Sequence, residues 1–128
     1  MPLWIFKCFL SEQRRDLIDE WYQGLPPAAQ AKFDTILEHL RDTPHIQWNS
    51  DIVCRLTDVD GIYEIRFKGR NVLYRPLGFF GPNRHEFTLL VPAREQGDRF
   101  VPRNAIALAE ERKRIVLQHK ERARECDF

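Results

Sequence analysis

The sequence lacks the long apolar segments that membrane proteins and secreted precursors carry. No run of about 18 apolar residues occurs, which argues against a membrane-spanning helix. The first residues also lack a charged segment followed by an apolar signal core. A chain of 128 residues with 43% hydrophobic content has room for one globular domain with a real core. We therefore expect a cytoplasmic protein with no membrane partner, built as a single domain over residues 1–128.

Cysteine and histidine are scarce. Cys8, Cys54 and Cys126 are odd in number, widely spaced and outside any CxxC pattern. Neither a disulfide framework nor a zinc site is therefore favoured, and the first two cysteines are expected to pack in strands. The four histidines show no pairing at metal-ligand spacing. The sequence predicts no metal and no cofactor.

The chain as a whole is also nearly neutral, since its net charge is +1. The distribution is nevertheless uneven. Residues 1–60 hold six Lys or Arg against ten Asp or Glu, whereas residues 61–103 hold eight against four. A basic segment in a nearly neutral protein indicates a local anion-binding surface, although a solvated sheet face would show the same charge pattern.

A meander of strands is predicted within that basic segment. Residues 63–68 alternate between apolar and charged side chains, which is typical of a strand with one buried face. The turn residues 69–71 lead into a second strand at 72–75, which predicts a β-hairpin. A second turn at 81–83 precedes a third strand at 87–91. We expect Tyr63, Ile65 and Phe67 to pack on helices, and the face with Glu64 and Arg66 to be open.

Helices are predicted on both sides of the meander. A strand at 3–9 is followed by a helix capped by Ser11, whose apolar stripe runs from Leu17 to Leu25. Pro26 and Pro27 separate it from a second helix, whose stripe runs from Phe33 to Leu40. A short strand is expected at 52–57. The last helix covers 102–118, and the charged tail after it is expected to fray.

These elements predict an α+β fold. An N-terminal strand and a two-helix hairpin pack on a mostly antiparallel sheet of about four to five strands, and a C-terminal helix completes the domain.

Three motifs in this order resemble those of a known toxin superfamily. They are GIYEIRF at 61–67, YR at 74–75 and LLVPAREQGDRFVPRNAIALAEERKRI at 89–115. On these motifs the chain resembles the RelE/ParE toxin superfamily and, within it, the phage-derived HigB-like branch. The resemblance spans nearly the whole chain and implies the RelE-like microbial RNase fold. It also implies a toxin of a type II toxin–antitoxin system, usually an mRNA interferase that cuts messenger RNA in the ribosomal decoding site.

The resemblance implies a catalytic set of Arg66, Arg75 and Arg94, which match basic positions of the family. In this chemistry the ribose 2′-hydroxyl attacks the adjacent phosphate, so cations must surround the phosphorane. Arg binds a phosphate in bidentate fashion, and the three guanidiniums are expected to clamp the scissile group. The remaining residues predicted to contact RNA are Lys68, Arg70, Arg99 and Phe100.

The general base is less evident, because Arg stays protonated in proteins. Some RelE-like toxins have a Lys where this chain has Glu64, and a Tyr or His where it has Phe100. Glu64 is a candidate base, although a cross-strand ion pair with an Arg is the role that the pattern favours. His85 precedes the third strand and is a further possibility, with a plain surface position as the alternative.

Two other function classes stay open. A ParE-like toxin with this fold inhibits gyrase without any nuclease site, and a plain interaction module would use the same sheet to bind a partner. For the toxin, the family implies a cognate antitoxin, expected to be a helix-turn-helix protein, and messenger RNA on the ribosome as partners.

Overall fold

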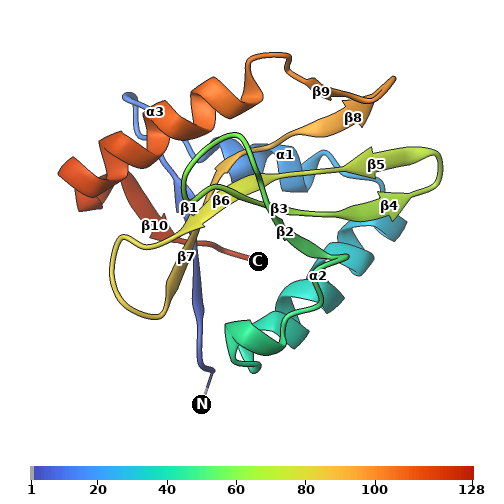
Figure 1. Cartoon of the computed structure of the whole chain (residues 1–128), viewed down its shortest axis with the longest axis horizontal. Coiled ribbons are helices and arrows are strands. Elements are labelled where there is room, and N and C mark those ends of the chain that lie inside the picture. Colours follow the sequence, from blue (N-terminus) through green and yellow to red (C-terminus); the bar gives the residue numbers. More distant parts are fainter. Residues whose placement is uncertain (1) are drawn as a thin grey trace.

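The computed structural model describes residues 2–128 and contains two β-sheets with helices packed against them (Figure 1). The α-helices are α1 (Leu17–Gln23), α2 (Pro27–Arg41) and α3 (Ala105–Gln118), with short 3-10 helices at His45–Gln47 and Lys120–Arg122. The predicted α+β class is confirmed, as are the N-terminal strand, the two-helix hairpin and the C-terminal helix. None of the helices in residues 2–128 is long and apolar enough to cross a membrane.

The larger sheet has six strands in the order β10-β1-β7-β6-β3-β2. Its strands are β1 (Ile5–Phe9), β2 (Val53–Arg55), β3 (Tyr63–Ile65), β6 (Leu77–Phe80), β7 (Glu86–Val91) and β10 (Ala123–Glu125). β1 and β7 pair in parallel, and the other pairs are antiparallel. Strand β7 is central, and its residues Phe87–Val91 are all buried, as expected for a strand with a helix layer on each face.

The smaller sheet has four strands in the order β4-β5-β8-β9. Its strands are β4 (Phe67–Gly69), β5 (Val72–Tyr74), β8 (Arg94–Gln96) and β9 (Arg99–Val101). They form two hairpins that extend from the same end of the molecule (Figure 1). The predicted hairpin across residues 69–71 is the β4–β5 hairpin, whereas the β8–β9 hairpin was not predicted.

The strands are more numerous than the four or five that the sequence predicted, partly because the expected strand at 63–68 is broken. The Arg66 N–H donates to the Ile52 carbonyl at the end of the larger sheet. β3 therefore ends at Ile65, and the next strand, β4, joins the smaller sheet. Period-two alternation continues through the break, so the pattern alone could not reveal it.

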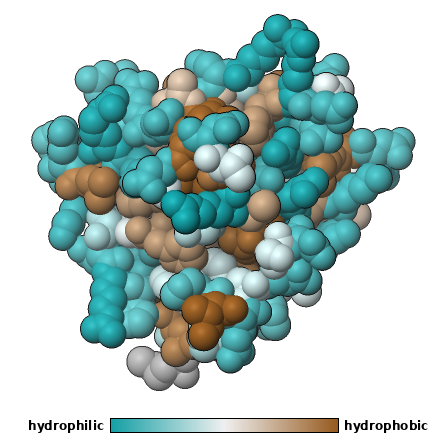
Figure 2. Space-filling view, viewed as in Figure 1, coloured by the Kyte–Doolittle hydropathy of each residue, from teal (hydrophilic) through white to brown (hydrophobic). Residues whose placement is uncertain are grey.

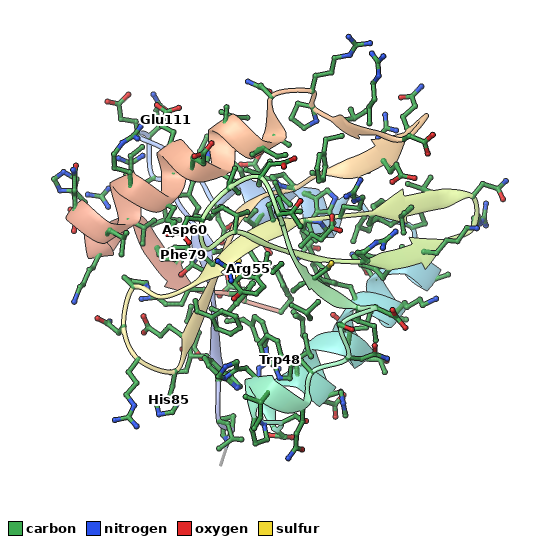
Figure 3. All side chains as sticks on the ribbon, in the orientation of Figure 1. Trp48, Arg55, Asp60, Phe79, His85 and Glu111 are labelled. Carbon is green, nitrogen blue, oxygen red and sulfur yellow. A yellow bond between two sulfur atoms is a disulfide. The ribbon has the colours of Figure 1, made fainter. Side chains whose placement is uncertain are left out.

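The hydrophobic core lies between the sheets and the helices. Phe67 stacks on Phe33 of α2 with ring centroids 5.0 Å apart, and Ile65 is fully buried. Trp48 closes the lower part of this core beside α2 (Figure 3). The predicted packing of the Tyr63/Ile65/Phe67 face on the two helices is confirmed. A second cluster under α3 includes Ala105, Ala109 and Val116, which form the buried side of that helix.

Helix α1 begins later than predicted. Its N-cap is Asp16, whose side chain accepts a hydrogen bond from the Asp19 N–H at 2.8 Å. Ser11 accepts from the Arg15 N–H instead and stabilises the turn before the helix. The predicted Ser11 cap is therefore wrong, because two polar residues able to cap lie within one short segment.

The C-terminal tail is ordered, contrary to prediction. β10 pairs antiparallel with β1, and Phe128 stacks on Tyr22 with ring centroids 4.2 Å apart. Cys8 and Cys126 form a disulfide, which corrects the expectation that no disulfide is present. The two cysteines are 118 positions apart, so their pairing depends on the strand topology and leaves no local spacing signal. Cys8 and Cys54 do lie in strands, as predicted.

Candidate functional site

The smaller sheet gathers nearly all of the predicted site residues. Lys68, Arg94, Arg99 and Phe100 lie in its strands. Arg70 is in the β4–β5 turn, Arg66 directly precedes β4 and Arg75 directly follows β5. Glu64 lies in β3 of the larger sheet and reaches the others through ion pairs. Hydrophilic side chains cover the free ends of the two hairpins (Figure 2).

Arg75 is the centre of an ion-pair cluster. Its Nε lies 2.6 Å from Glu64 Oε2, and its Nη1 lies 3.0 Å from Glu95 Oε1. The guanidinium also lies 4.0 Å from the centroid of the Phe100 ring. Because two carboxylates and one aromatic face occupy this guanidinium, Arg75 has little capacity left for a phosphate. Its clearest role is to tie β3, β5, β8 and β9 together.

Glu64 is buried rather than on an open face. Its side chain is 4% exposed, and it pairs with Arg75 and, at 3.8 Å, with Arg66. The expected open face is therefore wrong for Glu64, because the smaller sheet and its Arg partners cover that position. The role that the pattern favours, a cross-strand ion pair, is what the structure shows.

Arg66 keeps more freedom than Arg75. Its side chain is 40% exposed, yet its Nε is buried and has no hydrogen-bond partner within residues 2–128. A buried donor without a partner is costly, which favours an acceptor supplied by a ligand or solvent.

Arg94 lies on the other face of the smaller sheet. Residues that lie directly opposite each other in an antiparallel pair share a face of the sheet. Tyr74 of β5 lies opposite Phe67 on one side and opposite Arg94 on the other, so the three side chains share one face. Phe67 faces the helices, so Arg94 projects on the helix side, beyond the end of the core. Arg75 follows Tyr74 and points to the opposite face. The predicted trio of guanidiniums is thus divided between two faces.

Two hollows flank the β8–β9 hairpin. The first, of about 460 Å³, opens where β5 and β8 separate beyond the single pair Tyr74 and Arg94, and is lined by Lys68, Asn71, Val72, Leu73, Arg94, Glu95, Gln96 and Gly97. The second, of about 470 Å³, is lined by Gln96, Gly97, Arg99, Phe100, Val101 and Arg103. Gln96 and Gly97 are shared, so the tip of the hairpin separates the two hollows.

The cations around these hollows are free of carboxylates. None of them has an Asp or Glu oxygen within 4.0 Å in the part of the chain that the structure describes, and all are exposed: Lys68, Arg70, Arg94, Arg99 and Arg103. Arg103 lies within the third motif but was not among the predicted RNA contacts, because it lies between the last strand and α3. Only the folded hairpin places it beside Arg99.

Comparison with known protein families gives a match over most of the chain. Residues 20–114 match the family model described as Phage derived protein Gp49-like (DUF891). The chain belongs to the phage-derived Gp49-like family. This toxin-like family is related to RelE- and HigB-type toxins. Neither a curated protein nor a solved structure matches the chain significantly.

The part of this Gp49-like chain that matches the family model includes both hollows. Of the carboxylates in the cluster, Glu95 is the one that lines a hollow, and its side chain is 27% exposed. His85 lies exposed at the β6–β7 turn, far from the two hairpins (Figure 3). In the described chain, no group of three or more His, Cys, Asp or Glu is placed to hold a metal ion.

Proposed function

We propose that this Gp49-like protein is the toxin of a type II toxin–antitoxin system and inhibits translation as a metal-independent endoribonuclease acting on ribosome-bound messenger RNA. The observation that carries the proposal is the group of five exposed cations, without carboxylate partners, on and beside the smaller sheet. Unpaired Lys and Arg are the groups that bind a phosphodiester backbone. The family membership supports a toxin-like role, and the motif order supports placement within the RelE/ParE superfamily.

The first hollow contains the groups that RNA cleavage needs. The 2′-hydroxyl oxygen bonds to phosphorus while the bond from phosphorus to the 5′-oxygen breaks. Lys68 and Arg94 belong to opposite faces of the smaller sheet, but both line the first hollow where β5 and β8 separate, and there they stabilise the charge on the phosphorane. Glu95 takes the 2′ proton in place of the buried Glu64, and the Lys68 ammonium supplies a proton to the leaving 5′-oxygen. Arg75 orients the Glu95 carboxylate through their 3.0 Å hydrogen bond.

A cognate antitoxin of the helix-turn-helix class neutralises the toxin. We place it away from the basic sheet, on α3 and the N-terminal helices, where it blocks entry to the ribosome by its bulk. The exposed Leu117 of α3, 52% accessible, gives that side an apolar contact. A titration of the antitoxin against Arg66→Glu/Arg94→Glu protein tests this placement. Near-parental affinity supports it, and a large loss of affinity puts the antitoxin on the basic face.

The test of function compares translation and DNA supercoiling in lysate with purified protein. Arg94→Ala is the diagnostic variant, and Lys32→Ala is the matched control, because Lys32 is an exposed, unpaired cation on α2. We expect the parent and the control to stop translation and Arg94→Ala to lose about 10²–10³-fold in rate. Loss of supercoiling with translation intact would instead identify a ParE-like gyrase inhibitor. No effect on either would identify an interaction module.

A further inference from the structure

The two hollows beside the β8–β9 hairpin differ in chemistry. The first contains Lys68 and Glu95, which can transfer protons, together with Arg94. The second contains Arg99 and Arg103 as its charged side chains. Arg does not give up its proton in proteins, so the second hollow can hold a phosphate but cannot perform acid–base chemistry.

We propose that the β8–β9 hairpin is a finger inserted between two RNA backbone segments, one bound for cleavage in the first hollow and one held without cleavage by Arg99 and Arg103 in the second. This inference rests on the proposed function, since it divides the same basic surface into a reacting and an anchoring part. The ligand class is the phosphodiester backbone of RNA, from either the messenger or ribosomal RNA.

The tip of the hairpin is narrow enough for this role. Gln96 and Arg99 are paired, so only Gly97 and Asp98 form the loop, and both have positive φ, at 55° and 62°. Such a two-residue loop follows the twist of the strands and adds no width. A Cβ at Gly97 would have no neighbour within 4 Å, so space surrounds the tip.

The base of the finger is held by Arg75. Glu95 and Phe100 are directly opposed on β8 and β9, and the Arg75 guanidinium contacts both. These contacts fix the direction of the hairpin relative to β5. Arg75 is therefore a positioning residue, because it acts on RNA through the hairpin.

The experiment measures equilibrium RNA binding by fluorescence anisotropy over a range of salt concentrations. The two probes are a short single-stranded RNA and purified ribosomes. The variant is Arg99→Gln/Arg103→Gln. The matched control is Lys32→Gln/Arg84→Gln, which removes two exposed, unpaired cations, from α2 and the β6–β7 turn, that line neither hollow. For the single strand, loss of two phosphate contacts lowers the slope of log affinity against log salt by about 1.4, while the control keeps the parental slope.

If the Arg99→Gln/Arg103→Gln variant loses affinity for ribosomes alone, the anchored segment is ribosomal RNA. If it loses affinity for the single-stranded RNA alone, the anchored segment is messenger RNA. The inference would be overturned if this variant kept the parental affinity and salt slope on both probes. It would also be overturned if the parent protein bound neither probe. A parent that binds RNA through Arg99 and Arg103 yet cleaves no messenger would retain the anchor and refute the nuclease. Circular dichroism of both variants checks that these exposed substitutions leave the fold intact.

Discussion

Replacement of Arg75 by Ala should destabilise the protein strongly. Arg75 is 15% exposed and Glu64 only 4% exposed, so the change leaves a buried carboxylate without its 2.6 Å partner. Removal of one partner of a buried ion pair costs about 3–5 kcal/mol. The contact with the Phe100 ring adds about 0.5–1 kcal/mol, because it is partly exposed. Against a typical total of about 5–15 kcal/mol, this loss is large.

Urea unfolding followed by tryptophan fluorescence measures the cost. The matched variants are Glu64→Gln and the double variant Arg75→Ala/Glu64→Gln. Since Glu64→Gln removes the charge that Arg75→Ala would leave unpaired, the double variant should be clearly more stable than the sum of the two single effects predicts. A cost of Arg75→Ala below about 1 kcal/mol, typical of a surface pair, would refute the buried ion pair as a source of stability, as would strict additivity. Relief of toxicity by Arg75→Ala therefore does not by itself identify a catalytic residue.

Three further predictions concern stability. Phe67→Ala should lower the free energy of unfolding in urea by about 3–5 kcal/mol, because it truncates an aromatic ring that is only 3% exposed. Unchanged unfolding would show that Phe67 does not lie on the buried face. Cys126→Ser should cost up to about 5 kcal/mol under oxidising conditions, since the disulfide closes a long loop, and an equal effect with excess reductant would contradict this. Burial and the hydrogen bond to Asp34 raise the pKa of Tyr22 from 10.0 to about 12. Because the pKa of Tyr22 is higher in the folded state, its neutral form stabilises the fold fully below about pH 10, and this contribution is lost as pH rises towards about 12. In Tyr22→Phe, this fall in thermal stability with rising pH should disappear.

Periodicity predicted the elements that depend on local pattern. The two helical stripes, the hairpin at residues 69–71 and the buried side of Phe67 follow from spacing of apolar residues and turn residues alone. The break at Arg66 could not be predicted this way. A change of sheet requires a long-range hydrogen bond to Ile52 and leaves the alternation intact.

The residue types of the candidate site could be predicted from the sequence, but their arrangement in space could not. The basic segment and its motifs selected residues that the fold gathers on and beside the smaller sheet. They could not show that Arg94 projects on the other face from Arg75, because that depends on the register between β5 and β8. Nor could they separate Glu64 from Glu95: the two carboxylates flank one guanidinium and differ in burial, which only the packed structure decides.

The most direct test of the proposed nuclease activity is the chemistry of the RNA ends produced by the purified protein in a translating lysate. Attack by the 2′-hydroxyl predicts messenger fragments that carry 2′,3′-cyclic phosphate and 5′-hydroxyl ends, with cleavage lost in both Lys68→Ala and Arg94→Ala and retained in Lys32→Ala. Translation that stops while the messenger stays intact, or cleavage that persists at the parental rate in both variants, would contradict the proposed function of the first hollow.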